Sequence, residues 1–233
     1  MRTRILKLLI TLTLVSTSNF VFAIPAAERE ALIALYNSTA GANWTHNTGW
    51  LGPAGTECSW NGVTCLGDNI DFISLFNNQL TGSIPSELGQ LTQLTGLLLF
   101  SNRLTGSIPS ELEQLTQLRT LALNSNQLTG TIPSELGQLT QLTTLALDAN
   151  QLIGTIPREL GQLTQSMDLF LFSNRLTGSI PSDLEQLAQL VNLELYQNCL
   201  STSDQSLIVF LNGFGSSWED QRDDCSVIQL DTP

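Results

Sequence analysis

Few side chains in this sequence could do catalytic chemistry. A nucleophile activated by an adjacent base would need His46, the only histidine. The residue spacings typical of metal sites and of phosphate-binding loops are absent from the sequence. We therefore predict no catalytic residues, no metal ligands and no cofactor, and a protein that is not an enzyme.

Pairs of carboxylates are the remaining catalytic alternative. If the chain forms stacked coils, Asp148 and Asp168 come about 14 Å apart, too far for a glycosidase pair, whereas Asp168 and Glu194 come about 8 Å apart, inside the inverting range. No cleft is predicted around them, so hydrolysis is not favoured. Another acidic column recurs along the chain at Glu87, Glu111, Glu135, Glu159 and Asp183. It forms no compact loop of calcium ligands, and we interpret it as a solvated face.

These residues belong to a chain built from a sequence repeat. An asparagine recurs every 24 residues at Asn78, Asn102, Asn126, Asn150, Asn174 and Asn198. Apolar residues stand five and three positions before each asparagine, and the pattern L-[TI]-G-[ST]-I-P follows the first five. A period in the twenties with this leucine spacing indicates a solenoid.

The third repeat illustrates one coil. Leu121 and Leu123 alternate with polar or small residues, which predicts a short strand with one buried face. A second short strand is predicted over residues 128–132, and Pro133 ends it. Ser134 is expected to cap the turn of helix that follows. One coil cannot bury its own leucines, so stacking must supply the core.

The recurring asparagines are predicted to be structural rather than a binding site. Each stands where the chain turns off the first strand. A side-chain amide both donates and accepts hydrogen bonds, so a column of amides can satisfy backbone groups that the turn would otherwise leave unpaired.

These motifs resemble the plant-type leucine-rich repeat family, whose coils read LxxLxLxxNxLTGxIPxxLGxL. The resemblance covers residues 71–200, and flanking segments around CSWNGVTC and NCLSTSDQ are similar to caps of such proteins. It implies an α/β solenoid, namely a right-handed arc of about six coils with a parallel sheet on the concave face. Second short strands and helical or 3-10 turns lie elsewhere, and both ends are capped.

The expected domains are a signal peptide (1–23), an N-terminal cap (24–66), leucine-rich repeats (67–198) and a C-terminal cap (199–233). An elongated stack would keep the two ends apart, so we expect local disulfides, Cys58 with Cys65 and Cys199 with Cys225. Helical faces carrying Leu32, Leu35 and Tyr36, and Leu207, Phe210 and Leu211, are expected to seal the two ends.

The first residues predict export. Three basic residues precede an apolar run that closes with Val21-Phe22-Ala23, which is typical of a secretory signal peptide. The mature chain would keep six basic and 21 acidic residues, a formal charge of −15. We therefore expect a secreted or extracellular protein, periplasmic if the host is bacterial, that binds no nucleic acid and inserts in no membrane.

The candidate binding residues lie on the outward positions of the first strands. They are Phe76, Leu98, Phe100, Asn124, Asp148, Phe170, Phe172 and Tyr196. Exposed aromatic side chains often mark contacts, and here they form two apolar patches around a flatter polar centre. We expect a monomer that binds a protein or peptide on this concave face, with a glycan as an open alternative. The alternative without a binding function is that one patch packs against a cap and that the similarity of Phe100 and Phe172 was inherited by duplication.

Two other functions stay open. Hydroxyl-rich pairs from Thr81/Ser83 to Thr177/Ser179 form a ladder that resembles the threonine arrays of ice-binding proteins, so binding to ice or another crystalline surface is one alternative. The family resemblance also allows an inhibitor of extracellular polysaccharide hydrolases, like the wall-associated members.

Two departures from the repeat are informative. Ser166 stands where other coils carry leucine, which predicts a packing defect of about 2–4 kcal/mol unless Met167 or water fills the space. Glu113 and Glu185 replace a glycine that other coils keep. Because Phe100, Arg103 and Glu113 recur as a set 72 residues later, we interpret the two stretches as copies of one block.

Overall fold

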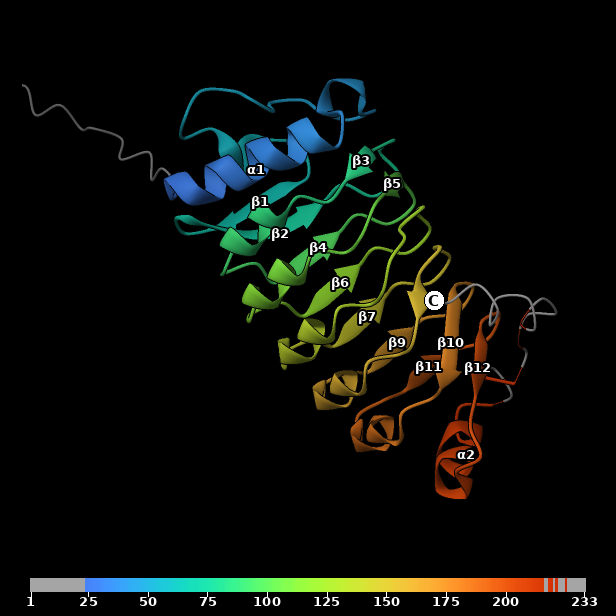
Figure 1. Cartoon of the computed structure of the whole chain (residues 1–233). Helices are drawn as coiled ribbons and strands as arrows, with labels where there is room; N and C mark the ends of the chain where they lie inside the picture. The colour runs from blue at the N-terminus through green and yellow to red at the C-terminus, as the bar shows by residue number, and fades with distance from the viewer. Residues whose placement is uncertain (1–23, 216–217, 220, 222–224, 226–233) are drawn as a thin grey trace, which may run out of the picture.

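The computed structural model describes residues 24–215, 218, 219, 221 and 225. Its coils stack along one axis, with helix α1 (Ala26–Ser38) over the first coil and helix α2 (Gln205–Asn212) at the far end (Figure 1). This confirms the predicted solenoid. The predicted signal peptide, residues 1–23, lies outside the described residues.

A seven-stranded sheet runs the length of the stack in the order β1-β2-β4-β6-β7-β9-β11. Its strands are β1 (Val63–Leu66), β2 (Asn69–Ser74), β4 (Gly96–Leu98), β6 (Thr120–Ala122), β7 (Thr144–Ala146), β9 (Asp168–Phe170) and β11 (Asn192–Glu194). Strand β1 is antiparallel to β2, and the others are parallel. The register joins residues 24 positions apart, such as Leu97 with Leu121, so the sequence period sets the pairing directly.

Outside the long sheet, the coils carry second strands on one side and 3-10 turns on the other (Figure 1). The strands are β3 (Thr81–Ser83), β5 (Arg103–Thr105), β8 (Ile153–Gly154), β10 (Arg175–Ser179) and β12 (Cys199–Ser201). The 3-10 turns of the coils are η3 (Ser86–Gln90), η4 (Ser110–Gln114), η5 (Ser134–Gln138), η6 (Arg158–Gln162) and η7 (Ser182–Gln186), and two more, η1 (Gly41–Asn43) and η2 (Glu57–Ser59), lie in the N-terminal segment.

Two local predictions for the third coil were wrong. Residues 128–132 alternate as predicted, with Leu128 and Ile132 buried, but they form only one isolated bridge, from Thr131 to Ile153. Ser134 does not cap the next turn, because Pro133 occupies the N-cap position. As the first residue inside the turn, Ser134 instead donates its hydroxyl hydrogen bond to the Glu135 carboxylate, at 3.2 Å.

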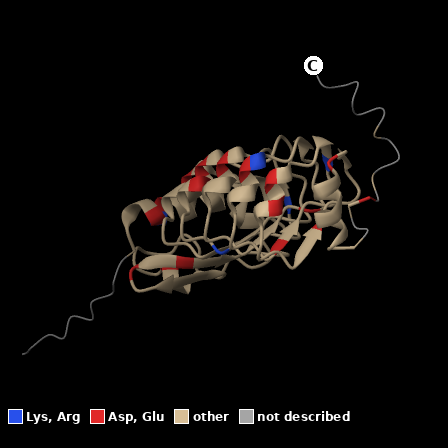
Figure 2. Ribbon diagram, turned by 90° about the horizontal axis from the view of Figure 1, so that it is seen from below, with Lys and Arg blue, Asp and Glu red and all other residues tan. Residues whose placement is uncertain are grey.

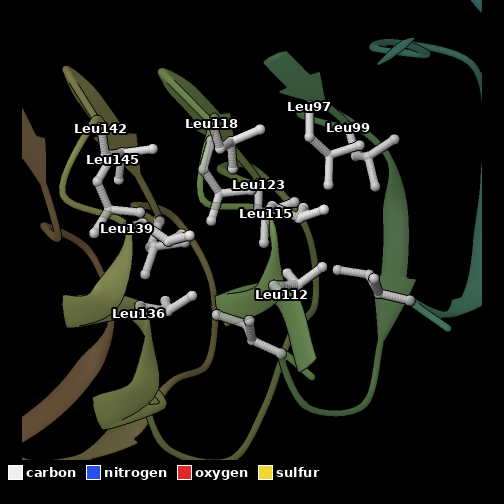
Figure 3. Packing of buried hydrophobic residues seen from close by; sticks show 14 of the residues in the cluster. Leu97, Leu99, Leu112, Leu115, Leu118, Leu123, Leu136, Leu139, Leu142 and Leu145 are labelled. Atoms are coloured by element: carbon white, nitrogen blue, oxygen red, sulfur yellow. The ribbon is translucent and has the colours of Figure 1, made fainter. Parts of the chain in front are cut away.

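The core lies between the long sheet and the 3-10 turns. Leucines from both sides, among them Leu97, Leu112, Leu123 and Leu136, have no exposed surface, and Figure 3 shows them packed between neighbouring coils. Each buried leucine contributes about 1.5–3 kcal/mol relative to exposure. The stability of the solenoid therefore depends on contacts between neighbouring coils, because no single coil could bury these side chains.

The asparagine column makes the predicted hydrogen bonds. The amide nitrogen of Asn150 donates to the carbonyls of Leu123, Leu147 and Asp148, at 3.0–3.2 Å, and its oxygen accepts from the Leu128 N–H. The residue before each asparagine has a positive φ between 50° and 55°, at Asn77, Ser101, Ser125, Ala149, Ser173 and Gln197. This left-handed turn costs roughly 1–2 kcal/mol per residue, which the asparagine hydrogen bonds help to offset.

Both ends are closed. The disulfides pair Cys58 with Cys65 and Cys199 with Cys225, as predicted. On α1, Leu32 and Leu35 are completely buried, whereas Tyr36 is half-buried and packs against Trp44 and Trp50. On α2, Leu207 and Leu211 are buried and Phe210 is half-buried.

The N-terminal segment also contains charged groups that the sequence patterns did not predict. The Glu28 carboxylate is buried and accepts a hydrogen bond of 2.7 Å from the Ile70 N–H, and burial raises the pKa of this carboxyl. Arg29 forms an ion pair with buried Glu57 and lies over the Trp60 ring. These contacts join α1 to the first strands and thereby hold the cap against the stack.

Candidate ligand-binding face

The outward column two residues before each asparagine carries two stacked aromatic pairs. Phe76 and Phe100 stack with ring centroids 4.7 Å apart and planes within 1°. Phe172 and Tyr196 stack with centroids 4.6 Å apart and planes within 11°. In-register coils repeat at about 4.8 Å, which is also a stacking distance for aromatic rings. The register therefore converts aromatic residues 24 positions apart into rigid pairs.

The two pairs flank a polar centre formed by Asn124 and Asp148. Asp148 is only 6% exposed, so the structure buries a side chain that the sequence pattern placed on the surface. The pKa of Asp148 is raised to about 6, chiefly by burial and in smaller part by the charge of Glu194, whereas hydrogen bonds from the Asp148 backbone and the Asn124 side chain oppose the shift.

The column four residues before each asparagine forms the floor beside these groups. Ala122 and Ala146 are both 7% exposed and present little bulk at the centre. Leu98 and Phe170 are half-buried on either side of them. The predicted division into two apolar patches and a flatter centre therefore matches the positions of the side chains.

A third outward column lies six residues before each asparagine, and of its members only Asp168 was identified from the sequence. At its first end the Phe72 ring lies against Gly96, where a Cβ would come within 2.0 Å of the ring. Farther along, Asp168 accepts hydrogen bonds from Thr144 at 3.0 Å and from Asn192 at 2.7 Å. The same 24-residue period, counted two positions further back, would have found this column.

The structure provides no support for catalysis by the carboxylate pairs or by His46. Both oxygens of Asp168 accept hydrogen bonds within the sheet, so this carboxylate is occupied rather than directed at a substrate. His46 is exposed, and its backbone exchanges two hydrogen bonds with the Asn78 amide. In the part of the chain that the structure describes, no three His, Cys, Asp or Glu residues come together as a metal site.

The acidic column follows the row of 3-10 turns, away from the long sheet (Figure 2). The hydroxyls of Ser86, Ser110 and Ser134 each donate to the adjacent glutamate. In η6 an arginine replaces this serine, and Arg158 reaches Asp183 of the next coil at 3.2 Å. The column is therefore a surface of local polar contacts.

The hydroxyl ladder lies along the short strands. Ser83, Thr105, Thr129 and Thr155 are exposed, as is Ile153 at 47%. The strands beneath them form two separate short sheets, β3-β5 and β12-β10-β8. A groove beside the ladder is lined by Ser83, Pro85, Ser107, Pro109, Thr131 and Pro133.

The asparagine-linked coils, the parallel sheet and the two caps define a leucine-rich repeat protein. The Leucine Rich Repeat family model matches residues 69–91, 93–115 and 117–139. The crystal structure of the BIR3–SERK2 complex from Arabidopsis thaliana is similar, with 33% identity, a TM-score of 0.59, and coverage of 73% of this chain and 96% of that one. The chain belongs to the plant-type leucine-rich repeat family.

Two further solved structures resemble the chain over less of their own length. A plant ice-binding protein has 32% identity and a TM-score of 0.70, with 76% of this chain and 58% of that one covered. The ectodomain of the Arabidopsis receptor kinase GASSHO1/SCHENGEN3, in complex with CASPARIAN STRIP INTEGRITY FACTOR 2, has 36% identity and a TM-score of 0.63, with 75% and 21% covered. No curated protein matches the sequence. Within the described residues, none of the helices has the length and apolarity needed to cross a bilayer.

Proposed function

We propose that this protein is an exported, non-catalytic recognition module that binds a protein or peptide on its concave face. The observation that carries the proposal is the pair of aromatic stacks, Phe76 with Phe100 and Phe172 with Tyr196. Large, rigid aromatic side chains are the residues that most often anchor protein interfaces.

The Phe76–Phe100 stack is not buried by the N-terminal segment. Phe76 lies beside His46 and Asn61 of that segment and still keeps 48% of its surface exposed. Its ring stacks on Phe100, in the next coil. Related structures support the assignment, since one is a receptor ectodomain in complex with CASPARIAN STRIP INTEGRITY FACTOR 2 and another is the BIR3–SERK2 complex.

The test is capture of a partner from the native medium, with identification by mass spectrometry. The double variant Phe100→Ser/Phe172→Ser removes one ring from each stack, and we expect it to lose the captured partner while keeping the circular dichroism spectrum of the parent. Ile153→Ser is the matched control, because it removes an exposed apolar side chain from the other flank. Equal capture by parent and double variant would contradict the proposal.

A second candidate is binding to ice through the hydroxyl ladder. The plant ice-binding protein is the observation in its favour, together with the parallel pairing of Ser83 with Thr105, although the same register sets Thr81 opposite Arg103. If the ladder binds ice, Thr129→Tyr/Thr155→Tyr should abolish freezing hysteresis and Phe100→Ser/Phe172→Ser should not. Absence of hysteresis in the parent protein would exclude this function.

A further inference from the structure

The charged side chains on the concave face are acidic, and such a face favours a partner with basic groups. Among the three outward columns, the described side chains with a formal charge are Asp148, Asp168 and Glu194, and all are acidic. The Asp168 oxygens are taken up by Thr144 and Asn192. Asp148 and Glu194 are the two carboxylates whose charges act on each other at the centre of the face.

Asp148 lies between the two aromatic stacks, and its distance from each of them limits which ligand residues could reach all three groups. Coils repeat at about 4.8 Å, so Asp148 lies about 5 Å from the Phe172 coil and about 10 Å from the Phe100 coil along the stack axis. The two inner rings, Phe100 and Phe172, are three coils or about 14 Å apart. An extended peptide that runs along the axis directs residues i, i+2 and i+4 to one side over about 13 Å. That span matches the distance between the rings.

The floor below this path admits a long side chain. Ala122 and Ala146 are small and leave the centre lower than the rings on either side. An arginine or lysine at position i+2 can lay its methylene stem over these alanines and bring its charge to the Asp148 carboxylate. Burial disfavours the charged form of the Asp148 carboxyl. A cation beside it would therefore stabilise that charged form and form an ion pair with it.

We infer that the partner presents an extended segment in which one basic residue stands between two large apolar residues, two positions from each. The apolar side chains contact the two stacks, and the basic side chain meets Asp148 and Glu194. This inference rests on the proposed function and names the peptide class that the same face recognises.

The probe is the nonapeptide Gly-Gly-Phe-Gly-Arg-Gly-Phe-Gly-Gly, blocked at both ends and titrated into the mature chain by calorimetry at pH 8. Replacing the arginine with norleucine keeps the apolar stem and removes the charge, and we expect affinity to fall at least about tenfold. A glutamate in the same place should bind more weakly still. Moving the two phenylalanines one residue closer together should also weaken binding, because alternate side chains then face away from the sheet.

The matched protein variants are Asp148→Asn and Glu135→Gln, which remove one carboxylate each from the centre of the face and from the row of 3-10 turns. Asp148→Asn should lower affinity for the arginine peptide toward that of the norleucine peptide, with little effect on the latter, and Glu194 accounts for any arginine preference that remains. Glu135→Gln should leave both affinities within about twofold.

Each contrary outcome has a distinct meaning. Equal binding of the arginine, norleucine and glutamate peptides would refute the inference that the partner presents a basic residue. An unchanged arginine preference in Asp148→Asn would refute it as well. No binding of the arginine peptide below about 1 mM, with capture from the medium still dependent on Phe100 and Phe172, would overturn this inference and leave the proposed function standing. Undiminished capture by the Phe100→Ser/Phe172→Ser variant would refute the proposed function itself.

Discussion

The rings of Phe76 and Phe100 are parallel to within 1°, although the two residues are 24 positions apart in the chain. The Asn77 N–H donates to the Phe100 carbonyl at 3.0 Å, which ties the two turns together directly behind the rings. A backbone bond between adjacent coils thus fixes the aromatic pair before any ligand arrives. Preorganisation of this kind lowers the entropic cost of binding.

The raised pKa of Asp148 predicts a pH-dependent stability. The carboxyl has a pKa of about 6 in the folded chain against 3.8 ordinarily, so its contribution to stability is full below pH 3.8 and is lost as pH rises through 6. Asp148→Asn should therefore raise the melting temperature by about 2–4 °C at pH 8 and give no rise at pH 4. Thermal unfolding at both pH values measures this difference, with Glu135→Gln as control. A shift of equal size at both pH values would contradict burial as the cause.

Ser166 provides a test of core packing. It is completely buried, its hydroxyl donates to the Asp168 carbonyl at 3.4 Å, and Met167 remains 47% exposed, so the methionine does not fill the leucine position. Ser166→Leu should raise the melting temperature by about 2–4 °C, corresponding to about 1 kcal/mol or more. Ser166→Ala, which removes the hydroxyl without filling space, separates packing from hydrogen bonding. A leucine variant no more stable than the alanine variant would show that the site has no room.

Loss of one ladder asparagine should be severe. Asn150→Ala removes three donor bonds and one acceptor bond and leaves buried backbone groups unpaired. We expect the free energy of unfolding to fall by about 3 kcal/mol or more. Urea titration followed by circular dichroism measures the loss, and Gln127→Ala, at an exposed position beside the same column, should change it little. Similar midpoints for the two variants would refute the structural role of the asparagines.

The two disulfides should contribute unequally. The Cys58–Cys65 bond spans 7 residues and the Cys199–Cys225 bond spans 26. Loop-closure entropy predicts losses of about 2.5 and about 3.5 kcal/mol respectively when each pair is changed to serine. Guanidinium unfolding of the two double variants gives both values. The reverse order would mean that the N-terminal bond acts through native packing around Trp60 rather than through the unfolded chain.

The fold was predictable from the sequence because the 24-residue period is also the strand register. Once Leu97 and Leu121 occupy the same position in successive coils, in-register pairing aligns the columns of the long sheet. The short strands instead pair residues 22 positions apart, such as Thr81 with Arg103. The short local elements were less predictable. Ser134 failed as a cap because the turn begins one residue earlier than its sequence pattern indicates, and residues 128–132 failed as a strand because only one bridge forms there.

Local period and alternation were enough to predict the repeat and the buried leucines, and the elongated stack that they imply was enough to predict the disulfide partners. The contacts among the residues on the concave face could not be predicted in this way. Phe172 stacks on Tyr196, Asp168 is held by Thr144 and Asn192, and Asp148 is buried with a raised pKa. Burial and electrostatic coupling depend on what neighbouring coils place around a side chain, and the period of a single strand carries no information about that environment.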